Sequence, residues 1–114
     1  MSTKTIYCPQ HMSIELVDQL IALFSEFMPV TRTNDMEQAD IKIRQSFDDF
    51  SSIYSEDILL IVTKYKPGEG QRIIFCSTHK CTYHPHIYDE FIKVDSWTDL
   101  KLDVNKKRII KYFL

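Results

Sequence analysis

The sequence predicts a two-layer α/β domain, in which a mixed sheet of four to five strands carries helices mainly on one face. Three observations predict this class. Two apolar runs flank a polar turn within residues 58–77, apolar residues recur at helical spacing within residues 13–28, and strand-like and helical segments alternate along the chain. We expect the two apolar runs to form a central β-hairpin with strands at about 58–66 and 72–77.

The hairpin prediction depends on its turn. Residues 58–62 are continuously apolar, which is typical of a strand covered on both faces. The only two glycines of the chain, Gly68 and Gly70, follow Pro67, and together these residues favour a turn over 66–71. An amphipathic helix over 58–66 is the competing interpretation, but branched aliphatic residues followed by Pro-Gly disfavour it.

The amino-terminal part predicts a strand over 3–8, ended by Pro9, and then a helix capped by Ser13. Pro29 ends this helix. The predicted apolar side of this helix consists of Ile14, Val17, Leu20, Ile21, Phe24, Phe27 and Met28. The opposite side of the helix carries acidic residues and no basic residue.

The middle of the chain predicts a loop over 31–38 and a strand over 39–45 with one face in water. Ser46 then predicts the start of a short helix over 47–54, because Asp48 and Asp49 would lie favourably in its first turn.

The carboxyl-terminal part leaves alternatives open. Residues 78–86 predict a loop, and residues 87–94 fit either a short helix or an edge strand. Alternating Leu100, Leu102 and Val104 indicate a strand. We expect a helix over 106–114, with a strand paired to 100–104 as the alternative.

Composition predicts one globular domain over 1–114. No apolar run reaches the ~18 residues of a membrane span, and the amino terminus lacks a signal-peptide pattern. Three cysteines, an odd number, favour a reducing compartment, so we expect a cytoplasmic protein, or a nuclear one if the source is eukaryotic. Acids exceed bases in residues 15–57, ten to three, whereas bases exceed acids in residues 58–114, ten to six. This distribution predicts a dipolar surface, unless the two halves interleave in the fold.

Residues 76–86 contain two cysteines and three histidines. Cys76, His79, Cys81 and His84 are the candidate zinc ligands, because their spacings resemble those of zinc knuckles. Cys76 lies in an apolar strand, however, and no glycine is available for a knuckle turn. We therefore expect core and loop residues here, and no metal or other cofactor.

Enzymatic patterns are weak. Cys8 or Cys81 with a histidine is a conceivable nucleophile pair, and the acid pairs 48–49 and 56–57 are more typical of solvated or capping residues. Because the glycines are confined to one turn, the chain has neither a Walker loop nor a G-x-G-x-x-G motif. Nucleic-acid binding through Lys106, Lys107, Arg108 and Lys111 is an alternative, which the pI of about 6.0 disfavours.

The sequence therefore favours a non-enzymatic intracellular protein-binding module, an inhibitor or sequestering protein with an acidic surface. A basic partner, such as a nuclease or a nucleic-acid-binding protein, would complement that surface. A small zinc- or nucleic-acid-binding subunit is one alternative, and a Cys/His-dependent enzyme is another. The candidate contact residues are Glu15, Asp18, Glu26, Asp48 and Asp49.

Overall fold

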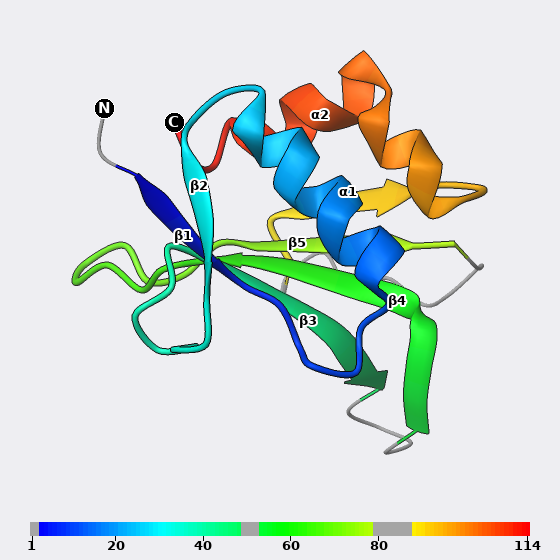
Figure 1. The fold of residues 1–114 in the computed structure, drawn as a ribbon, viewed down its shortest axis with the longest axis horizontal. Coiled ribbons are helices and arrows are strands. Elements are labelled where there is room, and N and C mark those ends of the chain that lie inside the picture. The colour runs from blue at the N-terminus through cyan, green and yellow to red at the C-terminus, as the bar shows by residue number, and fades with distance from the viewer. Residues whose placement is uncertain (1–2, 49–52, 79–87) are drawn as a thin grey trace.

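The computed structural model describes residues 3–48, 53–78 and 88–114, which form an α/β domain with a six-stranded mixed sheet (Figure 1). This confirms the predicted class, with one or two strands more than expected. The elements are β1 (Lys4–Tyr7), α1 (Ile14–Ser25), β2 (Val30–Thr33), β3 (Ile41–Asp48), β4 (Ile53–Thr63), β5 (Ile73–Ser77), β6 (Glu90–Lys93), the 3₁₀ helix η1 (Trp97–Lys101) and α2 (Asp103–Ile110).

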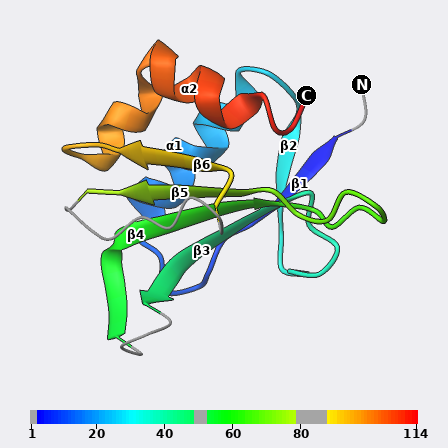
Figure 2. The same cartoon turned by 180° about the vertical axis from the view of Figure 1, so that it is seen from behind.

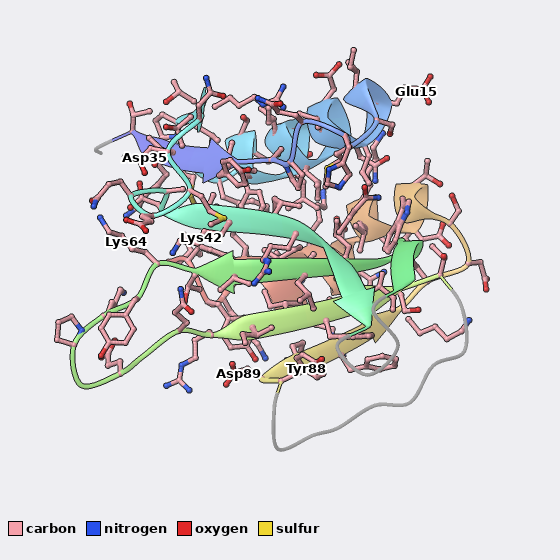
Figure 3. All side chains as sticks on the ribbon, turned by 90° about the horizontal axis from the view of Figure 1, so that it is seen from below. Glu15, Asp35, Lys42, Lys64, Tyr88 and Asp89 are labelled. Carbon is pink, nitrogen blue, oxygen red and sulfur yellow. The ribbon has the colours of Figure 1, made fainter. Side chains whose placement is uncertain are left out.

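The strand order is β2-β1-β3-β4-β5-β6. β1 runs parallel to both β2 and β3, β4 is antiparallel to β3 and β5, and β6 is parallel to β5. Seen from opposite sides, α1 and α2 lie over the same face of the sheet (Figures 1 and 2). The other face has no described helix over it and is turned toward the viewer in Figure 3.

The predicted central hairpin is confirmed. β4 and β5 pair in register from Ile58↔Ser77 to Val62↔Ile73. In the turn, Gly68 and Gly70 adopt φ values of 85° and 74°, and the backbone N–H of Gly70 donates to the carbonyl of Lys66 at 2.8 Å. Positive φ is the conformation for which glycine is favoured, so the turn forms as its residues predict.

The short helix predicted over 47–54 is wrong. β3 continues to Asp48 and β4 begins at Ile53, and the two strands pair through Phe47↔Tyr54 and Asp48↔Ile53. The register shifts between Gln45 and Phe47, so the pairing of β3 with β4 is irregular at the point where the helix was expected to begin. Pairing with a long partner strand satisfies the backbone here, which outweighs the local capping signal of Ser46.

The edges of the sheet also differ from expectation. Part of the predicted loop over 31–38 forms β2, a short edge strand that pairs with β1. At the opposite edge, residues 90–93 form β6, which decides between the two alternatives in favour of an edge strand. The strand expected from Leu100, Leu102 and Val104 is wrong, because these residues belong to η1, to the junction after it and to α2. The expected carboxyl-terminal helix is confirmed, with its start at Asp103.

The core lies between the helices and the sheet. The residues of α1 that are buried in this core are Leu16, Val17, Leu20, Leu23 and Phe24. The predicted helix is therefore confirmed with its apolar side rotated: Ile14, expected in the core, is 76% exposed. Ser13 caps α1 as predicted, its Oγ accepting from the N–H of Leu16 at 3.2 Å.

Candidate functional site: the charged surfaces

The outer side of α1 carries the first two predicted contact residues. Glu15 and Asp18 are both exposed, and α1 contains no basic residue. Ile14 lies one turn before Asp18 and is therefore its neighbour on the helix surface. This side of α1 therefore presents one exposed apolar side chain beside two carboxylates. We call it the α1 acidic side and define it by Ile14, Glu15 and Asp18.

Glu26, the third predicted contact residue, forms an ion pair with Lys106 of the same chain. Its Oε2 lies 2.8 Å from Nζ of Lys106, whose side chain is only 17% exposed and also lies 3.4 Å from Oδ1 of Asp103. The pair joins the end of α1 to α2. A partner would have to compete with Lys106 for this carboxylate, so Glu26 contributes less to an acidic surface than Glu15 and Asp18.

The last two predicted contact residues are not brought to α1 by any described contact. Asp48 is the final residue of β3, at the strand end that pairs with Ile53, and Asp49 lies outside the described residues. The five predicted acids therefore do not form one continuous described patch.

The predicted basic cluster at the carboxyl terminus is largely neutralised by acids of the chain. Glu90 of β6 accepts a hydrogen bond from Nε of Arg108 at 2.7 Å and one from the hydroxyl of Tyr112 at 2.9 Å, and Nζ of Lys111 lies 3.2 Å away. Burial favours a higher pKa for Glu90, but these bonds outweigh it and lower the pKa of the carboxyl below its ordinary value. With Lys106 paired to Glu26, Lys107 is the one predicted cation for which the described residues show no ion pair.

The two described cysteines are core residues. Burial raises the pKa of Cys8 to about 11, which nearby Arg32 offsets only in part, and raises the pKa of Cys76 to about 12 despite Arg108. Such thiols stay protonated at neutral pH, which argues against nucleophilic chemistry at Cys8. Among the described residues no group of three or more His, Cys, Asp or Glu side chains could hold a metal ion. Of the zinc candidates, His79, Cys81 and His84 lie outside those residues.

Sequence reasoning expected the strand over 39–45 to have one face in water, and the structure places that face on the side of the sheet without a described helix. Lys42 and Arg44 of β3 alternate with buried Ile41 and Ile43 and so lie on this face. Figure 3 labels Lys42 there. The alternation was visible in the sequence, but the strand neighbours of these cations were not, because they come from β1 and β4.

Comparison of the chain with protein-family models, with curated proteins and with solved structures finds no match. Within the described parts of the chain, no helix is both long enough and apolar enough to span a bilayer.

Proposed function

We propose that this protein is a non-enzymatic protein-binding module, an inhibitor or sequestering protein, that contacts a basic partner through the α1 acidic side. A nuclease or a nucleic-acid-binding protein has the required charge. The proposal includes a cytoplasmic location, which the odd number of cysteines favours.

The exposure of Ile14 beside Glu15 and Asp18 is the observation that carries this proposal. A protein-protein contact needs apolar area to bury and charges that complement the partner, and this side of α1 has both. The carboxylates steer a basic partner, and Ile14 gives it an apolar surface to bury. The raised pKa values of Cys8 and Cys76 support the non-enzymatic part of the proposal.

The test is capture of partners from the native host by the immobilised protein and by Glu15→Lys/Asp18→Lys. We expect the reversal to weaken capture of a basic protein by at least about tenfold, because two attractive charge contacts become repulsive. Glu69→Lys/Asp95→Lys is the matched control, since it changes net charge equally at exposed residues of the hairpin turn and of the segment before η1. Equal losses in both variants, or capture of acidic proteins by the wild type, would refute the proposal.

A further inference from the structure

The sheet has two edge strands, β2 and β6, and their outer sides differ. At the β6 edge, the carbonyl of Phe91 accepts a hydrogen bond from the guanidinium of Arg108 in α2, so the chain covers part of this edge with its own side chain. At the β2 edge, no described residue bonds to the outer backbone groups. An uncovered edge strand is a template for pairing with another strand, so β2 is the edge that is open to one.

The register of β2 shows which of its backbone groups are open. The N–H of Lys4 donates to the carbonyl of Pro29 at 2.9 Å, and Lys4 pairs with Val30. Successive residues of a strand bond to opposite sides, so Thr31 bonds toward β1. Val30 and Arg32 therefore direct their N–H and carbonyl groups away from the sheet.

The side chains of Val30 and Arg32 lie on the helical side of the sheet. Val30 is partly buried and packs against the core, and Arg32 pairs in register with buried Ile6. Side chains two residues apart in a strand share a face. Because Arg32 is exposed, the edge presents an apolar position and a cation on the side where α1 lies against β2.

One flank of α1 faces this edge. Gln19 donates a hydrogen bond to the carbonyl of Trp97, so the flank of α1 around Gln19 faces η1. Ile14 and Ile21 are two helical turns apart and lie roughly opposite Gln19 on the helix. They therefore face the β2 side, where Ile14 is 76% exposed and Ile21 is partly buried.

The edge has one charge of each sign. Arg32 is the charged residue of β2, and Asp18 is the acid of α1 nearest the facing flank; both are exposed, and neither has an ion pair among the described residues. Further charges lie at the two ends of the edge: Lys4 at the start of β1, and Asp35 and Glu37 in the turn after β2. Antiparallel pairing of two such edges sets the basic end of one beside the acidic end of the other, so this edge complements itself.

We propose that the β2 edges of two copies of this chain pair antiparallel and form a two-fold symmetric dimer. Thr31 of one copy lies opposite Thr31 of the other. Val30 of each copy lies opposite Arg32 of the other, and each such pair exchanges both backbone bonds, which satisfies the open groups. The two sheets become one continuous sheet across the two-fold axis.

The same pairing brings the two α1 helices together. Neighbouring strands lie about 4.8 Å apart, so equivalent positions between β1 and β2 in the two copies are separated by about 10 Å, the distance at which helices pack. The flanks that carry Ile14 and Ile21 then meet over the joined edge. Arg32 of each copy lies within reach of Asp18 of the other, so the interface combines apolar burial with balanced charge.

A second copy fits this edge better than an unrelated strand does. A foreign strand could use the same open backbone groups, but the edge offers it one acid and one base, with no single sign to recognise. The dimer covers Ile14 and Asp18, so a second copy and the basic partner proposed above compete for these residues. Self-association is measured on the purified chain alone, so its failure leaves the proposed function untouched.

The test is sedimentation equilibrium of the purified protein from about 5 to 500 µM, the range in which dimers with small interfaces dissociate. We expect the wild type to show a monomer–dimer equilibrium. Arg32→Pro removes an outward N–H but keeps the bonds to β1, so it should weaken dimerisation by at least about tenfold. Arg32→Gln keeps that N–H and should weaken dimerisation less.

A charge swap tests the contact between the edge and α1. Asp18→Arg and Arg32→Asp should each weaken dimerisation by at least about tenfold, whereas the double variant Asp18→Arg/Arg32→Asp should return to within about threefold of the wild type. Glu69→Arg, the same kind of reversal at an exposed residue of the hairpin turn, is the matched control and should leave dimerisation unchanged.

Disulfide formation tests the register. Opposite residues of a non-hydrogen-bonded pair have Cα atoms about 4.5 Å apart, within disulfide range, so oxidised Thr31→Cys should give a covalent dimer. Thr33→Cys places its two thiols about 14 Å apart in the same dimer and should not. The wild type is oxidised in parallel, because the chain has three cysteines of its own.

Circular dichroism checks folding, and the two cysteine variants decide the question if Arg32→Pro unfolds. A wild type that stays monomeric at about 500 µM, or one that assembles beyond the dimer, would overturn the proposal. Undiminished dimerisation of Arg32→Pro, a charge swap that dimerises no better than its single reversals, or equal cross-linking of Thr31→Cys and Thr33→Cys would overturn it as well.

Discussion

Glu90 joins the edge strand β6 to α2 through one carboxylate. Its side chain is only 14% exposed and receives bonds from Arg108, Lys111 and Tyr112. Hydrogen bonds to a charged group contribute more than neutral ones, and removing the charge leaves the two cations without their partner. The residue therefore has a structural role that its sequence position, at the start of a short strand, did not indicate.

We predict that Glu90→Gln lowers the free energy of unfolding by about 1–3 kcal/mol at pH 7. Because the pKa of Glu90 is lower in the folded than in the unfolded protein, its contribution is present above the unfolded-state pKa and is lost as pH falls through the folded-state pKa. Urea denaturation of both proteins from pH 7 down to pH 3 should show their difference shrinking. A difference that is constant with pH would contradict this account.

Cys8 and Cys76 behave as small apolar core residues, and their raised pKa values predict low reactivity. We expect both to resist iodoacetamide in the folded protein at pH 8 and to react quickly once the chain is unfolded in urea. Peptide mapping by mass spectrometry distinguishes the two positions. Rapid native-state labelling of Cys8 would contradict its burial and reopen the possibility of nucleophilic chemistry.

At the scale of elements, the β4–β5 hairpin shows how turn chemistry specifies a fold. Gly68 and Gly70 have open space around the position a Cβ would occupy, so a side chain there would meet no neighbour. Any cost of substitution therefore comes from positive φ alone.

We predict that Gly70→Ala lowers the free energy of unfolding by about 1 kcal/mol, and that Gly70→Asn costs less because asparagine tolerates this conformation better. Thermal or urea denaturation of the three proteins provides the measurement. Equal stability of Gly70→Ala and the wild type would show that the turn relaxes out of positive φ.

At the scale of the whole molecule, the charge distribution follows from the layers. The first half of the chain is acidic in sequence, yet Lys42 and Arg44 of that half lie on the helix-free face with Lys93 of the second half. In the helical layer, acidic Glu26 from the first half pairs with Lys106 from the second. The halves thus interleave at the α1–α2 contact, which is the alternative to a dipolar surface that the sequence left open.

Much of the fold could be predicted from local patterns. The α1 helix has a cap, a repeating apolar side and a proline stop, and the central hairpin has a glycine turn between apolar runs. The predicted helix over 47–54 failed because β4 offers a pairing partner that no local pattern in residues 46–54 reveals. Of the candidate contact residues, Glu15 and Asp18 could be found because periodicity places them on α1. The pairing of Glu26 with Lys106, which lie 80 residues apart in the sequence, could not be predicted from local patterns.

The sequence by itself determined the α/β class, the first helix with its exposed acids, and the central hairpin, because each depends on residues within one or two turns of chain. Only the tertiary structure decided which charges are neutralised, which cysteines are buried and which residues of β1 and β4 lie beside Lys42 and Arg44. Those properties depend on strand register and helix packing, where residues distant in sequence become neighbours, and the interaction that prevails is the one that satisfies the buried backbone and charges together.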